Sequence, residues 1–305
     1  MQCLIAIPTY NRSALIGRAI SSALAQTLET SSVVVIDDGS TDDTHKAVAS
    51  FLDNPRFCYV RLGANVGTAR AKNAAIAYGV YDAITFHDSD DIADPNKLML
   101  QARAMARQDV YADPCLNWEQ AGITPQSQLE IGVVLTQHWL IDADGSRRKI
   151  SRALSLVDDF FPNLQMNAGP LGDWILINSG LFRKRVFERM GGFEPSVEED
   201  RELRNRLLMH GEVIWLVNEP LLTKIESADS LTVAGGTSYA SHQRQQDRDV
   251  VWQRAAAWRT SGIAARLGID LENVVIDQVS RPEIFKIGAT FSCAPHQLSD
   301  EGKLS

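Results

Sequence analysis

The chain has 305 residues, 45% of them hydrophobic and 22% charged, so it can bury a large core in one domain, with or without an extension. Its formal net charge of −8 argues against a broad basic surface for nucleic acid. Four scattered cysteines, none of them in a C-x-x-C pair, fit a reducing compartment better than a zinc site or a disulfide framework.

The first hundred residues alternate short apolar runs with helical patterns. Strands are predicted at 4–7, 33–36, 57–62 and 83–86. Helices are predicted from residue 11 or 13 to about 27, from 40 or 41 to 52, over 67–78, and from 94–95 to about 108. This alternation indicates βαβ units around a mostly parallel, Rossmann-like sheet, which is an α/β fold.

The pattern changes after about residue 109. A hairpin is predicted from 131–140 and 147–150 around Asp144-Gly145, followed by a loop-rich cover at 151–170 and a strand at 174–182. Helices are predicted at 184–190 and 198–210, with a late strand at 214–217. After a Gly- and Ser-rich hinge at 234–238, residues 241–266 form a polar helix with an apolar stripe of Val250, Val251, Trp252, Ala255 and Trp258.

Polar motifs follow three of the predicted strands. They are the acidic runs 37–44 and 88–91 and the segment 65–73, which carries basic residues at a helix start. Ligands of open α/β sheets bind at the carboxyl ends of the strands, where crowded carboxylates call for a cation. Mg²⁺ or Mn²⁺ bridging to a diphosphate fits these oxygen ligands. Taken singly, each motif also fits a solvated acidic turn, an Asx-type cap or a solvated helix start.

Together, the motifs resemble family 2 glycosyltransferases, which have the GT-A fold. Residues 7–12 look like that family's opening strand and turn, 35–42 like its nucleotide-binding turn, and 65–73 like its next element. Asp88-Ser89-Asp90-Asp91 stands where the family's metal-binding D-x-D stands. Residues 191–194 and 199–207 are similar to the acceptor-side segment that carries the catalytic carboxylate.

The resemblance implies a role for each matching residue. Asp200 would be the general base, and Asp90 the principal ligand of Mn²⁺ or Mg²⁺. Asp38, beside Thr9, would bind the base, and Asp88 the ribose or the metal shell. The implied nucleotide-binding set is Pro8, Thr9, Tyr10, Arg12, Asp38, Asn65, Gly67, Arg70, Lys72, Asp88 and Ser89, and the implied sugar contacts are Asp91, Trp174 and Glu199.

The implied reaction is the metal-dependent, inverting transfer of one sugar from a nucleotide-sugar, UDP-linked above all, to a hydroxyl of a carbohydrate or glycoconjugate. No Q-x-x-R-W pattern of processive synthases is found, which favours single transfer. No run approaches the roughly 18 apolar residues of a membrane span. We therefore expect a cytoplasmic protein, with peripheral attachment to a membrane left open.

Some positions depart from the family pattern. Lys72 stands where the family often has Arg, and Arg70 is a substitute for the phosphate contact. Ser227 stands where many members have His, which makes His242 a candidate metal ligand.

Two other polar features are interpreted as structural. Asp142 and Asp144 form a second D-x-D, which we interpret as a hairpin turn. Strand alternation points His87 into the core.

The predicted organisation is a nucleotide-sugar-binding half (1–110), an acceptor-binding half (111–233) and a helical C-terminal extension (234–305), whose helix could form a homo-oligomer. The main alternative function is a degenerate GT-A domain that binds a sugar nucleotide or a partner without turnover. A haloacid dehalogenase-type phosphatase is disfavoured by Ile92, since its pattern calls for Thr or Val there. A dinucleotide oxidoreductase is disfavoured because no G-x-G-x-x-G follows the first strand.

Overall fold

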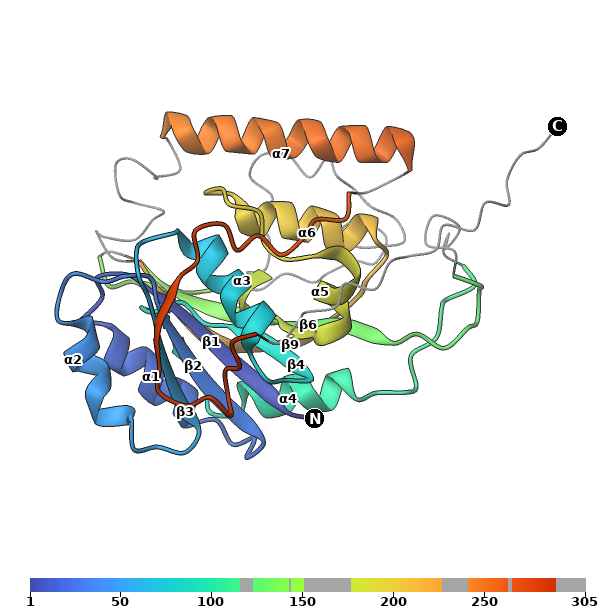
Figure 1. The fold of residues 1–305 in the computed structure, drawn as a ribbon. Helices are drawn as coiled ribbons and strands as arrows, with labels where there is room; N and C mark the ends of the chain where they lie inside the picture. Colours follow the sequence, from blue (N-terminus) through green and yellow to red (C-terminus); the bar gives the residue numbers. More distant parts are fainter. Residues whose placement is uncertain (116–122, 143, 151–176, 227–240, 263–264, 289–305) are drawn as a thin grey trace.

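The computed structural model describes residues 1–115, 123–142, 144–150, 177–226, 241–262 and 265–288 (Figure 1). The predicted alternation of strand and helix is confirmed in the first hundred residues. Its elements are β1 (Cys3–Thr9), α1 (Ile16–Leu24), β2 (Ser31–Asp37), α2 (Thr44–Val48), the 3₁₀ turn η1 (Ala49–Phe51), β3 (Phe57–Leu62), α3 (Thr68–Tyr78) and β4 (Ala83–Phe86).

Strands of both halves form one mixed sheet. Within the described residues its order is β10-β3-β2-β1-β4-β8-β6-β9-β5, with β7 paired to β6. The four strands β3, β2, β1 and β4 are parallel to one another, as expected. The remaining strands are β5 (Ile92–Ala93), β6 (Ile131–Ile141), β7 (Arg147–Ile150), β8 (Leu181–Arg183), β9 (Val213–Ile225) and β10 (Ile276–Val279).

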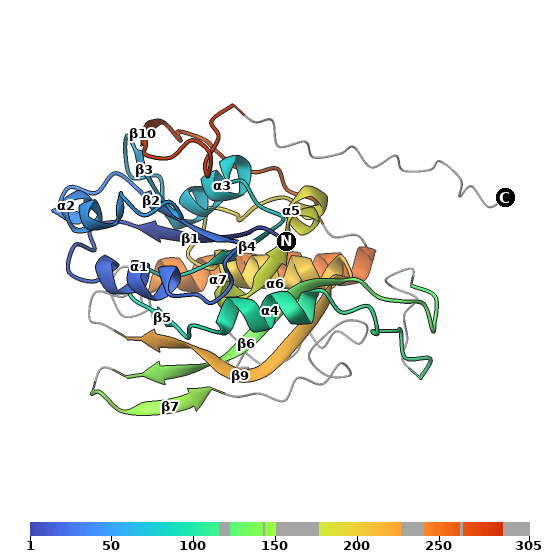
Figure 2. The same cartoon turned by 90° about the horizontal axis from the view of Figure 1, so that it is seen from below.

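Helices cover both faces of the sheet. One face is covered by α3, α5 (Lys184–Met190) and α6 (Glu199–Met209), around a core that includes Phe86, Phe182 and Phe187. The opposite face, turned toward the viewer in Figure 2, is covered by α1 and α4 (Lys97–Met105). The long helix α7 (His242–Ser261) packs on α6 and runs alongside it (Figure 1).

The first two predicted helices begin later than expected. Residues 11–15 precede α1, because Asn11 has a φ of 52° and its amide donates to Ser40 Oγ at 2.9 Å. Residues 40–43 precede α2, because Asn11 Oδ1 accepts from the amide of Thr41 at 2.8 Å. The hydrogen bonds between residues 11–15 and 40–43 therefore keep both turns out of the helices that follow them. The helix expected from 94–95 likewise begins at Lys97, since Asp94 Oδ1 accepts from the Asn96 amide at 2.9 Å.

The second half follows the prediction only in part. The β6–β7 hairpin, α5 and α6 are confirmed. The strand expected at 174–182 was wrong, because Ile177–Ser179 form a 3₁₀ turn and β8 begins at Leu181; residues 174–176 lie outside the described part. β9 is longer than the expected 214–217, because it continues through Pro220 where its register to β6 shifts.

The segment after α7 was expected to be part of a helical extension, but it carries a strand. β10 pairs antiparallel with β3, and the Tyr59 amide donates to Ser280 Oγ at 2.8 Å. The predicted apolar stripe of α7 is confirmed in part: Val251, Ala255 and Trp258 are buried, whereas Val250 is 50% exposed. The homo-oligomer expected through this helix stays a prediction. Among the described helices, none combines the length and apolar character needed to cross a membrane.

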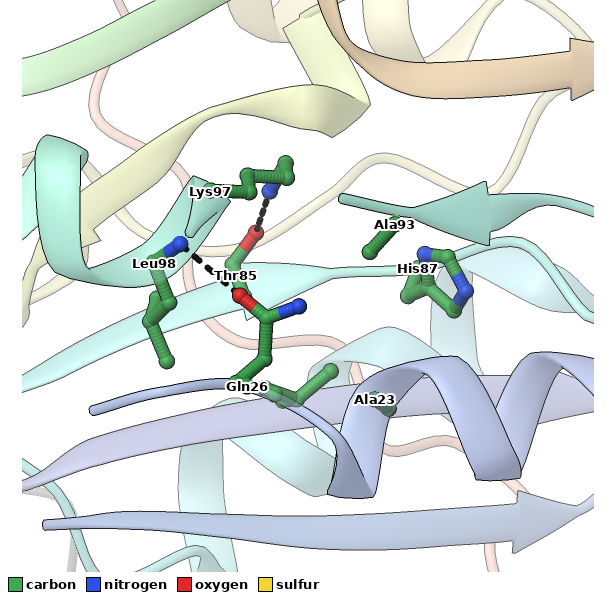
Figure 3. Close-up of a pocket in the computed structure, with 8 residues that line it drawn as sticks. Ala23, Gln26, Thr85, His87, Ala93, Lys97 and Leu98 are labelled. Carbon is green, nitrogen blue, oxygen red and sulfur yellow. Dashed lines mark hydrogen bonds between the residues drawn. The ribbon is translucent and has the colours of Figure 1, made fainter. Parts of the chain in front are cut away.

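A small cavity of about 10 Å³ lies between α1, α4 and the sheet, on the face away from α3 (Figure 3). Its wall contains the buried Lys97, whose Nζ donates to Thr85 Oγ1 at 3.3 Å and to Gln101 Oε1 at 3.1 Å. Both partners are neutral, so burial lowers the pKa of Lys97 to about 7. His87 also lines this cavity, in agreement with the prediction that it belongs to the core.

Lys97 should make the free energy of unfolding depend on pH between about 7 and 10. The folded state loses the proton above about pH 7, whereas the unfolded lysine keeps it to about pH 10.4. The unfolded state therefore binds more protons in this window, and the free energy of unfolding should rise by up to about 1.4 kcal/mol per pH unit. In urea titrations from pH 7 to 10, Lys97→Met should remove this rise and Lys46→Met, at an exposed position, should not. Parallel curves for wild type and Lys97→Met would contradict the prediction.

Candidate functional site

The turns after β1 and β2 form one structural unit at the carboxyl edge of the sheet. Asn11 accepts from the Thr41 and Asp42 amides at 2.8 and 3.3 Å. The Arg12 amide donates to Thr44 Oγ1 at 3.0 Å. Because Asn11 adopts a left-handed backbone, its side chain can point back into the second turn. The predicted motifs 7–12 and 35–42 are therefore placed together.

Asp38 connects this unit to the start of α3. Its carboxylate accepts from the Val66 and Gly67 amides at 2.7 and 2.9 Å. Gly67 has a φ of 91°, a conformation that favours glycine. Burial raises the pKa of Asp38 despite these two hydrogen bonds. Asp38 thus holds the loop that carries Asn65, in addition to any contact with a ligand.

Thr9 supplies an unpaired polar atom beside Asp38. Its carbonyl accepts from the Asp38 amide at 2.8 Å, while its hydroxyl is buried and has no hydrogen-bond partner in the structure. A buried hydroxyl without a partner is uncommon in folded proteins and requires an explanation. A ligand bound at this edge of the sheet would supply the missing hydrogen-bond partner of the Thr9 hydroxyl.

The acidic run after β4 is crowded and largely buried. Asp91 is 1% exposed and accepts from the Ile225 amide of β9 at 3.3 Å. Burial and the charge of Asp88 raise the pKa of Asp90, and burial raises that of Asp91 well above its ordinary range. Burial would also raise the pKa of Asp88, but Lys224 and Lys72 outweigh it and lower the pKa.

Lys224 is a site residue that we did not predict. Its Nζ lies 3.8 Å from Asp88 Oδ2, and it comes from the part of β9 beyond the predicted strand end at 217. The strand was expected to stop before Lys224, and the register shift of β9 near Pro220 removes the regular spacing that could have pointed to it.

Lys72 links the acidic run to the first turn of α6. It is 1% exposed, its Nζ lies 3.0 Å from Glu199 Oε1, and it stands 4.8 Å from the centre of the Phe193 ring. Burial would lower the pKa of Lys72, but the negative charges of Glu199 and Asp88 outweigh it and raise the pKa. Asp200, the predicted general base, is the next residue of that turn and also acts on Lys72.

Asn73, beside Lys72, fixes the Gly191–Phe193 motif against α3. Its side chain accepts from the Phe193 amide at 2.7 Å and donates to the Phe193 carbonyl at 2.9 Å. A Cβ at Gly192 would lie 2.2 Å from Asn73 Oδ1, so only glycine allows this approach. The buried Arg206 of α6 donates to the Gly192 carbonyl at 2.6 Å and so holds the motif from the other side.

Several predicted residues lie differently from what their roles suggested. Arg70 pairs with Asp270 at 3.2 Å and Glu272 at 2.7 Å, so its guanidinium contacts carboxylates of the segment after α7. His242 is exposed at the first residue of α7. Among the described residues, no group of three or more His, Cys, Asp or Glu is arranged to hold a metal. The metal site proposed below therefore does not include His242.

The other predicted residues are placed as follows. Pro8 and Ser89 are buried, Arg12 is partly buried, and Tyr10 and Asn65 are exposed. Trp174 and Ser227 lie outside the described residues. The Asp142–Asp144 sequence lies at the β6–β7 turn, as predicted, and residue 143 itself is outside the described part.

Comparison with known proteins identifies the domain. Residues 4–152 match the model of glycosyl transferase family 2. The chain is 37% identical over 109 residues to the UDP-Glc:alpha-D-GlcNAc-diphosphoundecaprenol beta-1,3-glucosyltransferase WfgD of Escherichia coli, which covers 35% of this chain and 42% of that protein. It spans 34%, 17% and 42% of the first three curated relatives, less than half of each.

Solved structures agree on the fold. TarS of S. aureus in complex with UDP-GlcNAc aligns with a TM-score of 0.58 at 17% identity, over 84% of this chain and 66% of that one. The mannosyltransferase PcManGT of Pyrobaculum calidifontis, in complex with GDP-Man and Mn²⁺, aligns with a TM-score of 0.51 at 18% identity, over 85% and 64%. The expected GT-A fold is confirmed.

Removing the Lys72 charge should destabilise the fold by stranding Glu199. Breaking a buried pair costs about 3–5 kcal/mol, and the partial exposure of Glu199 reduces this to about 2–3 kcal/mol for Lys72→Met. Lys72→Met/Glu199→Gln should recover at least half of the loss. Burial raises the pKa of Glu199, so the deficit of Lys72→Met should shrink as the pH falls from 7 toward 4.5. Urea unfolding of the wild type, Lys72→Met and the double variant between pH 7 and 4.5 measures these free energies. A loss of stability in Lys72→Met that does not depend on pH would contradict this explanation.

Proposed function

We propose, from the premise that residues 4–152 belong to glycosyl transferase family 2, that this chain transfers a single sugar from a nucleotide-sugar to an acceptor hydroxyl. The observation that carries the proposal is the convergence of three groups at one sheet edge. These are Thr9 with Asp38, the acidic run 88–91, and the Glu199–Asp200 turn, the last two connected by Lys72. The acceptor class is a carbohydrate or a glycoconjugate.

The donor site lies where the turns after β1, β2 and β4 meet. The unpaired Thr9 hydroxyl and the remaining lone pairs of Asp38 can bind polar groups of the base or ribose. Helix α3 begins at the same edge, and the positive end of its dipole favours phosphate. We assign a UDP-linked donor. Two similar proteins support this choice: TarS, solved in complex with UDP-GlcNAc, and WfgD, named for a UDP-Glc donor. PcManGT is solved in complex with GDP-Man, so the test below compares UDP with GDP.

The acidic run fits a divalent ion. Burial raises the pKa values of Asp90 and Asp91, and neighbouring carboxylates add to the rise, so a cation beside them would favour their ionised forms. Mg²⁺ and Mn²⁺ are commonly held by one or two carboxylates together with substrate phosphates, so a set smaller than three protein ligands is sufficient. Asp90, with Asp88, would hold the ion, which when bound stabilises the charge of the departing diphosphate.

Asp200 is the proposed general base for an inverting transfer. It lies in the first turn of α6, where the helix dipole favours a carboxylate, and its Oδ1 accepts from the Arg201 amide at 2.7 Å. Its role is to accept the proton of the acceptor hydroxyl as that oxygen attacks the anomeric carbon. Glu199, held by Lys72, and Asp91 would border the sugar.

Nucleotide binding can be tested with UDP, GDP, dTDP and CDP, each with and without Mn²⁺. Unfolding monitored by differential scanning fluorimetry should shift upward for UDP with Mn²⁺, since a hundredfold excess over Kd stabilises the fold by about 2.7 kcal/mol. Asp90→Asn should lose the Mn²⁺-dependent part of the shift. Asp144→Asn, in the hairpin turn, is the matched control and should keep it. Equal shifts with and without Mn²⁺ would contradict the proposed metal site.

Asp200→Asn tests catalysis separately from binding. Loss of a general base lowers the rate by about 10²–10⁴-fold, while the nucleotide Kd should change less than about twofold. Transfer to candidate sugar acceptors and donor hydrolysis without acceptor are measured together, and NMR of the product gives its anomeric configuration. A retained configuration would contradict inversion. Nucleotide binding with neither transfer nor hydrolysis in the wild type would indicate a degenerate domain.

A further inference from the structure

Glu198, the residue directly before Glu199 and Asp200, has an unusual environment for a helix N-cap. Its carboxylate makes no capping hydrogen bond to α6. It is 2% exposed and instead accepts from Arg201 Nε at 2.5 Å, Arg244 Nη1 at 3.1 Å and Arg248 Nη2 at 3.3 Å. A buried carboxylate is costly unless it is paired, so these guanidinium groups fix its position.

Two of the three arginines come from α7, and α7 holds the same turn in two further ways. Asp247 Oδ2 accepts from the Val197 amide at 2.9 Å. Arg201, which contacts Glu198, also lies 5.9 Å from the Trp252 ring of α7. Helix α7 therefore contacts Val197, Glu198 and Arg201, which flank the Glu199–Asp200 pair. Its position alongside α6 in Figure 1 allows these contacts.

Helix α6 also has packing contacts away from this cluster. Leu203 and Leu207 are buried in the main core, and Arg206 pairs with Glu202 and with the Gly192 carbonyl. A second ion pair, Arg254 with Glu194, joins α7 to the segment before α6 and leaves both side chains more than a quarter exposed. The buried cluster is thus concentrated at the one end of α6 that carries Asp200.

We propose that Glu198 is a positioning residue: clamped by Arg244 and Arg248 of α7, it sets the direction of the Asp200 carboxylate toward the acceptor hydroxyl. The inference rests on the proposed function, in which Asp200 is the base. Because a misplacement of about 1 Å can lower a rate about a hundredfold, a clamp of this kind affects turnover more than donor binding. It gives α7 a role in the reaction although none of its residues is assigned to the substrate.

The test compares Glu198→Gln with Arg254→Gln in the full chain. Glu198→Gln should lower kcat about 10- to 100-fold and change the donor KM and the nucleotide Kd less than about threefold. Arg254→Gln removes the other ion pair between α7 and the segment before α6 and should leave kcat within about twofold. Arg244→Gln should lower kcat by a smaller factor than Glu198→Gln, because Arg201 and Arg248 still hold Glu198, and the two changes should be less than additive in the double variant.

Hydrogen exchange on the ligand-free protein gives a readout that does not depend on activity. Exchange in the peptide 197–203 should rise about tenfold in Glu198→Gln and stay unchanged in Arg254→Gln. Unchanged exchange, or a loss of donor affinity equal to the loss of kcat, would overturn the inference. A wild-type protein that binds nucleotide without transfer would overturn the proposed function, and exchange would still decide whether α7 orders this turn.

Discussion

The buried ammonium group of Lys72 lies between two sets of carboxylates that would otherwise repel each other. Its Nζ lies 3.0 Å from Glu199 Oε1, and the charges of Asp88 and Asp200 also raise its pKa. Since Lys72 belongs to α3, its position is fixed by the same helix whose start is held by Asp38. The next residue, Asn73, binds Phe193 and so locks the approach to α6. The acidic run 88–91 and the Glu199–Asp200 turn therefore both interact with one residue of α3.

The sequence predicted the parts of the site that depend on local pattern. The acidic runs after β2 and β4 and the turn before α3 lie at one sheet edge because parallel strands bring their carboxyl ends together. Groups whose position depends on distant pairing were missed. Lys224 reaches Asp88 only because β9 continues past Pro220, and Arg70 contacts Asp270, which follows it by 200 residues. Neither contact leaves a periodic signal in the chain.

The segment after α7 supports both sides of the site. β10 adds to the sheet beside β3, and the Asp270 carbonyl accepts from Asn73 Nδ2 at 3.0 Å. The Leu267 amide donates to the Met190 carbonyl at 3.1 Å, just before the glycine motif. A Cβ at Gly191 would lie 1.8 Å from the Leu267 carbonyl oxygen, so the two backbones touch. This close contact explains why two consecutive glycines stand there: one faces Asn73 and the other faces the returning chain.

Charge balance at the edge of the sheet connects metal and donor in the proposed function. A diphosphate entering alone would meet the carboxyl groups of Asp90 and Asp91, whose pKa values are raised by burial and further by neighbouring carboxylates. A divalent ion entering alone would find few protein ligands, since the described residues form no group of three. Each therefore supplies what the other lacks: the ion offsets the carboxylates and the diphosphate completes its oxygen shell. Burial would raise the pKa of Asp88, but Lys224 and Lys72 already offset part of the negative charge and lower it.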